Sequence, residues 1–396
     1  MAKKILVSAG DPSGDLILSR LVREIQEKAG ADAPEFFGLA GPNCEAAGVR
    51  LIAKSQDVAV VGVTEVLKNL GKILGTLKTM ENALAQADGL LCVDFPDFNF
   101  KLAARAKKMG KPVDYLVAPQ IWAWRHGRIS QLKNFVRRLY PILPFEEGFF
   151  REAGIDAHYF GHPIRDVLPP KARKSAREDL KIHSDDFLFA LLPGSRRSEL
   201  AKHLPIFVEA WHELRIELSR RRDSRIVRVV LPLAPGLTLE DLKATLTLSQ
   251  QRKFQTWIDY REWVIDDDSW KTLQAADFGW IASGTASLEA AYYQIPHILV
   301  YKLNRLSALL IQRGSHFSTG LGLAGLPNIL LEKSVIPELL QSNLDPKRLR
   351  SETVELLYDQ GRLQALKREL RWLPKKMGAS GVLERIAEDY LKLWSF

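Results

Sequence analysis

Two carboxylates stand directly after one short apolar run of the sequence. Asp94 and Asp97, in the segment DFPDFN, follow the apolar residues Gly89–Val93. A carboxylate at the end of a buried strand can act as a general base, which takes a proton from a hydroxyl group as that group reacts. Asp97 could instead be the N-cap of a helix that runs to about Met109. The residues alone leave both interpretations open.

A strand-to-helix turn that could bind phosphate is the second candidate. The segment LLPGSRRSE follows the apolar run Phe187–Leu192 and precedes a helical pattern. Gly194 and Ser195 would form the turn, and the start of the helix would offer unpaired N–H groups to a phosphate. Arg196 would add a permanent positive charge with bidentate geometry. The alternative is an ordinary turn in which Ser195 or Ser198 caps the helix.

A similar turn occurs in the segment SGTASLE. Ser283, Gly284 and Thr285 would again present backbone N–H groups, and Glu289 lies one turn into the helix that follows. A carboxylate at that position could accept hydrogen bonds from both ribose hydroxyls of a nucleotide. Glu289 could also complete a helix cap with the backbone of Thr285 or Ala286.

The turn at residues 10–15, GDPSGD, is acidic where a phosphate-binding loop would carry Gly or Lys. Asp11, Ser13 and Gly14 therefore suit contacts with sugar hydroxyls better than contacts with a phosphate. Asp15 is also a good residue for the first turn of a helix, because its charge complements the helix dipole.

Two tryptophans could contact a sugar or a lipid. Trp122 and Trp124, in the segment QIWAWR, are two residues apart, so both rings would lie on the same side of an extended loop. Aromatic rings in this arrangement can face sugars or acyl chains, and they pack equally well in a core.

An amphipathic pattern runs through residues 66–77. Its apolar residues recur at helical spacing, and its lysines lie off the apolar stripe. A basic amphipathic helix can lie in the interface of an anionic membrane, whereas most such helices pack on their own sheet. The candidate membrane contacts are Leu67, Leu70, Ile73, Leu74 and Leu77.

These candidate residues lie among short apolar runs that alternate with helical patterns. This alternation predicts parallel sheets covered by helices on both faces. Sheets of this kind bind ligands at the carboxyl ends of their strands. The expected strands are Lys4–Ala9, Gly89–Val93, residues 112–117 and 156–160, then Phe187–Leu192, residues 225–231, 278–281 and His297–Tyr301.

The alternation is interrupted at residues 166–186, which contain Pro169-Pro170 and a stretch rich in lysine and arginine. We therefore expect an α/β protein with two Rossmann-like, doubly wound domains that face a central cleft, followed by a helical C-terminal segment. The expected boundaries are residues 1–165 for the first domain, 166–186 for the linker region, 187–350 for the second domain and 351–396 for the C-terminal helices.

The excess of positive charge on the chain indicates which classes of binding partner to expect. The 56 Lys and Arg residues outnumber the 47 Asp and Glu residues, which favours anionic partners. These cations are spread along the chain, and no nucleic-acid-binding motif occurs, so we expect no nucleic-acid partner. The chain has no run of about 18 apolar residues that would predict a membrane-spanning helix. We also expect neither a metal nor a cofactor, because no spacing typical of metal ligands occurs.

Nine motifs in one order resemble a single family. They are AGDPSGD, DFPDFN, APQIWAWR, ILPFE, FGHP, LLPGSRRSE, SGTASLE, LPN and PELLQ. Together they resemble the lipid-A-disaccharide synthase family over nearly the whole chain, from about residue 4 to residue 390. The resemblance implies a GT-B fold and an inverting glycosyltransferase that uses a UDP-sugar donor.

The resemblance also implies the substrates and the roles of several residues. The family joins UDP-2,3-diacylglucosamine to 2,3-diacylglucosamine 1-phosphate and releases UDP, in lipid A biosynthesis at the cytoplasmic face of the inner membrane. This implies an acceptor site in the first domain, a donor site in the second, and peripheral contact with an anionic membrane. Asp97 matches the base, with Asp94 beside it, and Arg196 matches a donor-phosphate residue. Further matches near the donor are Asn328, Glu338 and Gln341.

The sequence departs from the family pattern in two places. Asp11 is shorter than the Glu that many members carry, and a Gly-rich insertion at residues 313–325 precedes LPN. The alternatives are a related GT-B transferase that uses UDP-N-acetylglucosamine, a UDP-sugar epimerase, and an inactive nucleotide- or lipid-binding paralogue. DFPDFN and WAWR argue against the first, the amphipathic stripe against the second, and the retained Asp97, Arg196 and Asn328 against the third. A homo-oligomer stays open, as do the acyl-chain length and the donor sugar, glucosamine or a diamino analogue.

Overall fold

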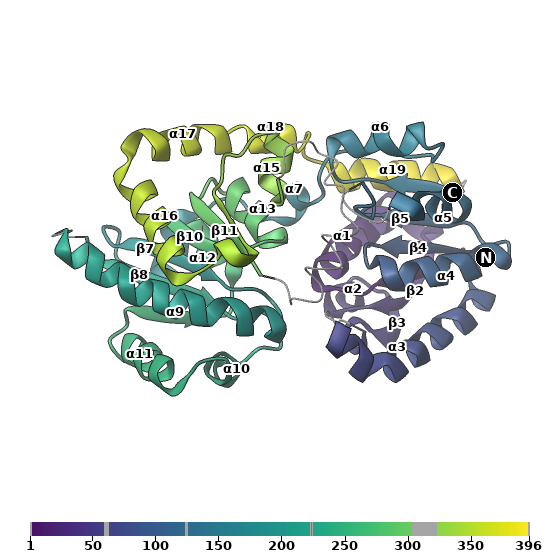
Figure 1. Ribbon diagram of the computed structural model, residues 1–396. Helices are drawn as coiled ribbons and strands as arrows, with labels where there is room; N and C mark the ends of the chain where they lie inside the picture. Colours follow the sequence, from purple (N-terminus) through teal and green to yellow (C-terminus); the bar gives the residue numbers. More distant parts are fainter. Residues whose placement is uncertain are drawn as a thin grey trace. The chain divides into compact units, whose positions relative to one another are not determined.

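The computed structural model describes residues 2–58, 63–122, 126–221, 223, 225–302 and 323–394, without the side chains of residues 63–69 and 126. The described chain forms two compact units. Unit 1 contains the residues up to Val167 and those from Met377 onward, and unit 2 contains the described residues between them. Each unit is built on its own sheet (Figure 1).

The sheet of unit 1 has six strands within the described residues, in the order β3-β2-β1-β4-β5-β6. All its neighbouring strands are parallel. The switch in strand order lies between β1 and β4, where Ala9 pairs with Val93. The strands are β1 (Lys4–Ala9), β2 (Glu35–Ala40), β3 (Arg50–Lys54), β4 (Gly89–Val93), β5 (Val113–Leu116) and β6 (Arg138–Tyr140).

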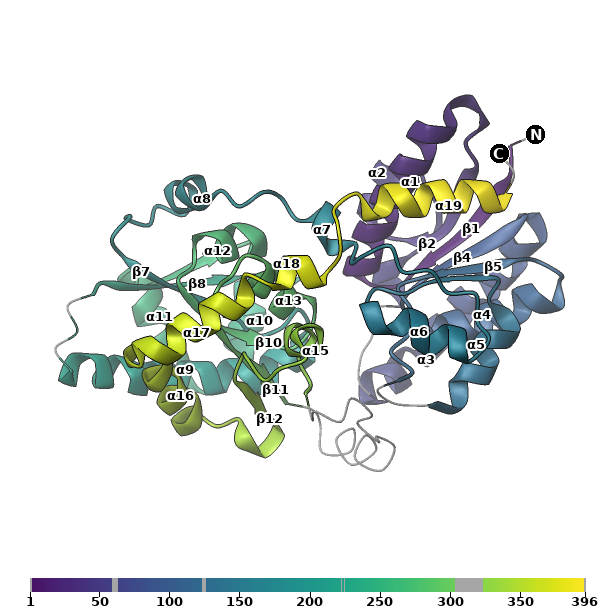
Figure 2. The same cartoon turned by 90° about the horizontal axis from the view of Figure 1, so that it is seen from above.

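Helices cover both faces of this sheet (Figure 2). One face packs on α3, α4, α5 and α6, and the other on α1 and α19. Because both faces are covered, a central strand can be apolar throughout, as β4 is, whose five residues are all buried. The helices are α1 (Pro12–Ala29), α2 (Pro42–Ala46), α3 (Val63–Ala83), α4 (Pro96–Lys108), α5 (Ile129–Phe135), α6 (Pro144–Glu152), α7 (Ile164–Val167) and α19 (Val382–Trp394).

The last helix, α19, completes unit 1 although it is far from the rest of that unit in sequence. Lys28, at the end of α1, forms ion pairs with Glu384 and Glu388 of α19. The carboxylate of Asp166 accepts hydrogen bonds from the N–H groups of Gly381 and Leu383, each at 2.8 Å. Asp166 therefore satisfies backbone groups at the start of α19 that would otherwise lack partners.

The sheet of unit 2 has the same strand order, β12-β11-β10-β7-β8-β9, again with six described strands and only parallel pairs. Its switch point lies between β7 and β10, where Leu192 pairs with Ile281. The strands are β7 (Phe187–Leu192), β8 (Val227–Pro232), β9 (Trp263–Asp266), β10 (Phe278–Ala282), β11 (His297–Tyr301) and β12 (Glu338–Leu340).

The core of unit 2 is rich in aromatic residues, and its largest buried side chains include Trp211, Trp263 and Trp280. Phe189 of β7 packs edge to face on Trp211 and Trp280, and Trp211 packs in the same way on Trp263. Phe207 of α9 packs tilted against Trp280. The helices are α8 (Arg173–Asp179), α9 (Arg197–Arg220), α10 (Leu239–Ala244), α11 (Leu248–Asp259), α12 (Ser269–Ala275), α13 (Thr285–Tyr292), α15 (Leu326–Leu331), α16 (Pro346–Tyr358), α17 (Gln360–Leu370) and α18 (Leu373–Lys376).

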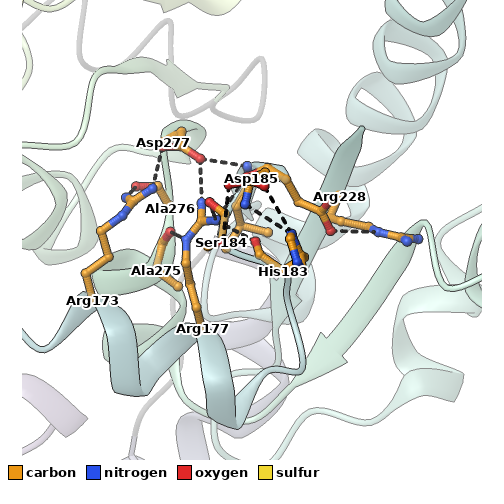
Figure 3. Close-up of polar contacts among 11 residues, drawn as sticks. Arg173, Arg177, His183, Ser184, Asp185, Arg228, Ala275, Ala276 and Asp277 are labelled. Carbon is orange, nitrogen blue, oxygen red and sulfur yellow. Dashed lines mark hydrogen bonds and ion pairs between the residues drawn. The ribbon is translucent and has the colours of Figure 1, made fainter. Parts of the chain in front are cut away.

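Most of the segment expected to be a linker folds onto unit 2 (Figure 3). The guanidinium of Arg177 on α8 is buried, and it donates to the Asp277 carboxylate at 2.6 Å and to four backbone carbonyls. Arg173 donates to the other oxygen of Asp277, also at 2.6 Å. These bonds attach α8 to the start of β10. Residues 168–186 are therefore a packed part of unit 2.

The expected strand at residues 156–160 is wrong. Only Ala157 forms a bridge, to Leu139 at the outer edge of the sheet. The chain then leaves the sheet at Gly161, whose φ of 120° favours glycine, and Pro163 has no N–H group for a ladder. The sequence pattern also missed β2, β3, β6, β9 and β12.

Candidate functional site

In unit 1, two of the predicted turns lie side by side at the switch point. The turn at residues 10–15 follows β1, and the turn at residues 94–97, called here the carboxylate turn, follows β4. Because β1 and β4 are neighbours and parallel, the structure brings Asp11, Ser13 and Gly14 next to Asp94 and Asp97 at one sheet edge. This is the position at which open α/β sheets bind ligands.

The carboxylate turn has an uncommon backbone. Asp94 and Phe95 are both left-handed, with φ of 44° and 49°. Such angles are costly for residues with a side chain and persist only where the surroundings fix them. Tyr115 Oη and Asn99 Nδ2 fix this turn by donating to the Asp94 carbonyl, at 2.6 and 2.8 Å. Gly10 leaves room for the Phe95 ring, which a Cβ atom there would meet at 2.3 Å.

Asn99 is fully buried and ties the two neighbouring turns together. Its Oδ1 accepts a hydrogen bond from Ser8 Oγ at 2.6 Å, and its Nδ2 also donates to the Ser8 carbonyl at 3.2 Å. Ser8 lies near the end of β1, so Asn99 connects that strand to the carboxylate turn. The sequence analysis assigned it no role, although it is the last residue of DFPDFN.

Asp97 is exposed and lies in the first turn of α4. Its side chain is 67% exposed, and its Oδ1 accepts from Arg128 Nη2 at 2.6 Å. The N-cap position of α4 is Phe95, which makes no side-chain cap. The alternative that Asp97 is an N-cap is therefore wrong, because the helix already begins at Pro96. Arg128, which sequence reasoning missed, orients this carboxylate.

In the turn after β1, Asp11 acts as the N-cap of α1 and accepts from the Gly14 N–H at 2.8 Å and from Ser13 Oγ at 2.6 Å. The buried Asp15 carboxylate accepts from the N–H groups of Gly41, Asn43 and Cys44. Asp15 thus fixes the turn between β2 and α2, while Asp11 and Ser13 stay partly exposed at the sheet edge.

Trp122 is buried, whereas the sequence analysis left open a ring facing a ligand. Its Nε1 donates to Glu146 Oε1 at 2.8 Å, and its ring packs edge to face on Phe145. Core packing is therefore the correct alternative for Trp122. Trp124 lies outside the described residues.

Glu146, in the motif ILPFE, is a fully buried carboxyl that the sequence analysis did not single out. Its Oε2 accepts from the N–H groups of Ile142 and Leu143, each at 3.0 Å. Burial and, to a smaller extent, the nearby Asp94 charge raise the pKa of Glu146 to about 7, although the hydrogen bonds from Trp122 and the backbone oppose this shift. Glu146 thus holds the segments after β5 and β6 at the same edge as the carboxylate turn.

In unit 2, the two predicted phosphate turns also meet at the switch point. The arginine turn, residues 194–198, follows β7, and the threonine turn, residues 283–285, follows β10, its direct neighbour. Gly194 has a φ of 123°, and a Cβ there would meet Glu199 at 2.5 Å. Only glycine fits this position without strain.

The arginine turn already holds one carboxylate. Glu199 accepts from the Ser195 N–H and from Arg196 Nη1, both at 2.9 Å. Arg196 occupies the N-cap position of α9, so the alternative that Ser195 or Ser198 caps this helix is wrong. The Arg196 side chain is partly exposed.

His203 connects the arginine turn to the end of β11. Its Nδ1 lies 2.6 Å from the Pro193 carbonyl, and its Nε2 accepts from the Lys302 N–H at 3.1 Å. Both contacts suit a neutral imidazole with its proton on Nδ1. Burial lowers the pKa of His203, which favours this neutral form. The sequence analysis did not find this residue.

Helix α13 begins after Gly284 without a side-chain cap there, and Glu289 lies one turn into the helix. Burial raises the pKa of Glu289 to about 7, and a hydrogen bond from the Trp270 indole opposes the shift. Ser287 closes the first turn of α13 by donating to the Gly284 carbonyl at 2.8 Å. Thr285 is exposed at the start of that helix.

Asn328 and Glu338 form a hydrogen-bonded pair that holds the backbone beside β12. Asn328 has no exposed surface, and its Nδ2 donates to Glu338 Oε1 at 2.8 Å. Glu338 also accepts from the N–H groups of Ala324 and Gly325. These two residues thus position a loop, and Asn328 does so without an exposed atom. Gln341, left-handed with φ of 53°, follows β12 at the same sheet edge.

The amphipathic stripe divides between core and surface along α3. Leu70 and Leu74 are 41% and 47% exposed, whereas Leu77 is buried and Ile73 packs on the core. Membrane contact by Leu77 is therefore wrong, because this part of the helix lies over the sheet. The Leu67 side chain and residues 313–322 of the insertion lie outside the described residues.

The described residues offer neither a metal site nor a membrane-spanning helix. They contain no group of three or more His, Cys, Asp or Glu side chains placed to hold a metal ion. None of their helices combines the length and the apolar character needed to cross a membrane.

Structures with known coordinates share the fold at low sequence identity. UDP-GlcNAc 2-epimerase from Neisseria meningitidis, bound to UDP-GlcNAc, superimposes with a TM-score of 0.62 at 11% identity, over 98% of this chain and 100% of that one. A calicheamicin glycosyltransferase gives a TM-score of 0.56 at 14% identity, over 99% and 98% of the two chains. These likenesses establish the GT-B architecture of two Rossmann-like units, as the sequence predicted.

Sequence relatives are more specific. The lipid-A-disaccharide synthase of Anaeromyxobacter dehalogenans is 36% identical over 99% of this chain and 97% of its own length. That of Myxococcus xanthus is 35% identical over 98% and 97% of the two chains. The family model described as lipid-A-disaccharide synthetase matches residues 5–377, which include both switch points. The chain therefore belongs to the lipid-A-disaccharide synthetase family.

Proposed function

We propose that the chain is the glycosyltransferase that makes the lipid A disaccharide, joining UDP-2,3-diacylglucosamine to 2,3-diacylglucosamine 1-phosphate. The observation that carries this proposal is the family match over residues 5–377, which covers the turns at both switch points. The products are the disaccharide 1-phosphate and UDP.

UDP binds unit 2 at the arginine and threonine turns. Ser195 and Arg196 now donate to the Glu199 carboxylate, which supports the view that they can hold a phosphate oxygen in its place. The N-terminus of α9 and the Arg196 charge then stabilise the negative charge that builds up on the departing diphosphate. Glu289 accepts hydrogen bonds from the ribose hydroxyls. Gln341 and the loop fixed by Asn328 and Glu338 complete the donor site.

Asp97 of unit 1 is the general base. The acceptor hydroxyl oxygen attacks C1 of the donor sugar, the new C1–O bond forms, and the bond from C1 to the diphosphate oxygen breaks with its electron pair going to UDP. The hydroxyl proton goes to Asp97, whose exposure and fixed position beside Arg128 support this role. Asp94 contributes mainly through the backbone that positions Asp97. Asp11, Ser13 and Gly14 bind acceptor hydroxyls.

The acylated substrates reach the enzyme at an anionic membrane surface. The exposed Leu70 and Leu74 of α3 support peripheral contact, because apolar side chains on a basic protein can enter the interface of such a membrane. We propose that this membrane is the inner membrane and that the protein lies on its cytoplasmic face, in keeping with the membership of the lipid-A-disaccharide synthetase family.

Mass spectrometry of the products tests the proposal. Incubation with UDP-2,3-diacylglucosamine and 2,3-diacylglucosamine 1-phosphate should give the acylated disaccharide 1-phosphate and UDP in equal amounts. Incubation with the donor alone is the control, and release of a free epimerised sugar there would support an epimerase. Binding of UDP without any disaccharide would contradict the proposal and support an inactive paralogue.

A further inference from the structure

Unit 2 carries a basic surface around one exposed tryptophan, away from both switch points in sequence. It is formed by α17, α18 and the end of α15, and is called here the Trp372 patch. Figures 1 and 2 show α17 and α18 following one another along the outside of unit 2. Neither the arginine turn nor the threonine turn contributes a residue to it.

Trp372 is the centre of this patch. Its side chain is 56% exposed, and it is the one tryptophan in the described part of the chain that is classed as exposed. The neighbouring Leu370 and Leu373 are buried, so they hold the turn between the two helices in place. The buried neighbours fix the turn, and the turn holds the Trp372 side chain outside the core. An exposed tryptophan on a fixed turn suits a boundary between apolar and polar surroundings.

The charges around Trp372 are mostly positive. Residues 360–378 contain six Lys or Arg and one acidic residue, Glu369. Lys333 pairs with Glu369 at 3.1 Å, and Lys376 pairs with Glu332 at 3.2 Å. Arg362 pairs with Glu352 and Glu355. Three further exposed cations have no carboxylate partner among the described residues. They are Arg368, Arg371 and Lys375.

Trp372 and Lys375 line one cavity of about 610 Å³, together with the ion pairs Lys333–Glu369 and Lys376–Glu332. Lys375 Nζ lies 5.4 Å from the centre of the Trp372 ring, on the same cavity as Lys333 and Lys376. Buried Leu331 adds an apolar wall. Phosphate groups of a lipid headgroup would meet Lys375 and the exposed Arg368 and Arg371 nearby in sequence, while the indole ring enters the interfacial layer.

We propose that the Trp372 patch is a docking surface for an anionic phospholipid membrane, separate from α3. Charge complementarity favours this occupant, because a lipid surface offers many phosphates to cations that lie on three different elements. It goes beyond the function proposed above, since it involves neither the transfer reaction nor the UDP site. It also does not depend on whether α3 touches lipid.

Vesicle binding by the full chain tests this proposal. The variant W372S/K375E should bind vesicles of phosphatidylcholine and phosphatidylglycerol at least fivefold more weakly, since each lysine near such a surface contributes about a fivefold factor. The matched control is L248S/R252E, which removes an exposed apolar side chain and reverses one exposed cation on α11 of the same unit. The control should bind as the wild type does. Both variants should keep the wild-type affinity for UDP, which shows that unit 2 is folded.

A second measurement locates the tryptophan. Lipids brominated near the headgroup should quench part of the wild-type tryptophan fluorescence, and W372F should lose that part while still binding the vesicles. Equal binding by W372S/K375E and its control, together with equal quenching in W372F, would overturn the proposal. If W372S/K375E bound vesicles as the wild type does but no longer self-associated in sedimentation velocity, the proposal would be overturned. The occupant of the patch would then be a second copy of the chain. If the wild-type protein made no disaccharide, the results of the vesicle-binding and quenching measurements would still stand. The proposed transfer reaction and the proposed docking surface can therefore fail independently.

Discussion

Asp97 combines two properties that a general base needs, exposure to a substrate and a fixed orientation. The ion pair with Arg128 orients it, and a pair this exposed contributes only about 0–1 kcal/mol to stability. Its position after Pro96 means that the start of α4 does not depend on its side chain. Activity and stability can therefore be separated at this residue.

Asp97→Asn should lower kcat by about 10²–10⁴-fold, because the amide cannot take the acceptor proton. The affinity for UDP and the melting temperature should change little. Steady-state kinetics, calorimetry with UDP and thermal unfolding measure the three quantities, with Asp32→Asn on the surface of the same unit as a control. A variant that keeps more than about a tenth of the wild-type kcat would show that the base lies elsewhere, with Asp11 next in line.

Glu289→Gln should stabilise the protein while weakening UDP binding. The pKa of Glu289 is raised to about 7 in the folded chain from 4.5, so the folded state loses stability as pH rises from about 4.5 to 7. Glutamine does not ionise, so the variant should be more stable by about 1–2 kcal/mol above pH 7, with a smaller gain at pH 5. Its amide oxygen replaces only one of two acceptors for ribose hydroxyls, so UDP binding should weaken by about 1.5–3 kcal/mol.

Urea unfolding at pH 5 and pH 8, with calorimetry of UDP binding at pH 8, checks both halves of the Glu289 prediction. A stability difference that does not grow with pH would show that Glu289 is already ionised at low pH. An unchanged affinity for UDP would remove Glu289 from the donor site. The two results are independent, since one concerns the free protein and the other the complex.

At the scale of single elements, α8 shows how the segment between the two units acquires a fixed position. Arg177 and Arg173 both bind Asp277, but Arg177 is buried and Arg173 is partly exposed (Figure 3). Arg177 also satisfies three carbonyls near the start of β7 with one nitrogen, Nη1. The two arginines form a natural pair for comparison.

Arg177→Met should destabilise unit 2 by about 3–5 kcal/mol, because it removes the buried cation that pairs with Asp277 and leaves several carbonyls without their donor. Arg173→Met should cost at most about 1 kcal/mol, since water can replace an exposed arginine. The midpoint of urea unfolding measures both. Equal effects of the two substitutions would show that the buried network does not hold α8 in place.

The exposed face and the buried face of α3 lead to a second prediction at this scale. Leu70→Ser with Leu74→Ser should lower binding to anionic vesicles by roughly tenfold or more, because two exposed leucines no longer enter the interface. UDP affinity and melting temperature should stay unchanged. Leu77→Ser, which alters the buried face, should instead lower the melting temperature. If the double variant binds vesicles normally, or unfolds as easily as Leu77→Ser, α3 is only a core helix.

Some elements could be predicted from the sequence and others could not, for physical reasons. The bounds of β1, β4, β7 and β11 match their apolar runs, because strands covered on both faces are apolar throughout. The edge strands β3 and β9 are only partly buried, and their mixed sequences RLIAK and WVID give no clear run. Strand order was not predictable either, so the pairing of turns at each switch point emerged only from the sheets.

Some of the candidate site residues could likewise be predicted from the sequence, and others could not. Gly194 and Asp97 follow from a turn after an apolar run, which is a local pattern. The pair of Asn328 and Glu338 joins residues ten positions apart, and His203 joins two strand ends, one of them 99 positions away in sequence. No local pattern distinguishes such residues from exposed ligand contacts. Trp122 was ambiguous for that reason until its bond to Glu146 placed it in the core.

For the whole molecule, the two units share one strand order but present different chemistry at their switch points. Unit 1 presents carboxylates, and unit 2 presents backbone N–H groups with an arginine. This predicts a division of labour in which substitutions in one unit leave the task of the other unaffected.

Arg196→Ala should weaken UDP binding by about 1.5–3 kcal/mol, the usual contribution of a hydrogen bond to a charged group. The melting temperature should change little, because the side chain is partly exposed and its one described partner, Glu199, also accepts from the Ser195 N–H. Calorimetry with UDP measures the effect, with Arg220→Ala at the far end of α9 as a control. An affinity equal to that of the wild type would exclude Arg196 from the donor site.

The position of α19 has a consequence for how the chain is made. Unit 1 needs Asp166 bound to the start of α19 and Lys28 paired with its side chains, yet α19 leaves the ribosome only after all of unit 2 has been synthesised. Domains generally fold in the order of synthesis. In this chain the synthesis of unit 1 begins first, but its folding can be completed only after α19 has been made. The apolar surface of unit 1 that α19 covers therefore stays exposed while unit 2 folds. A nascent chain paused during translation of unit 2 is therefore a natural client for a chaperone that binds apolar surface.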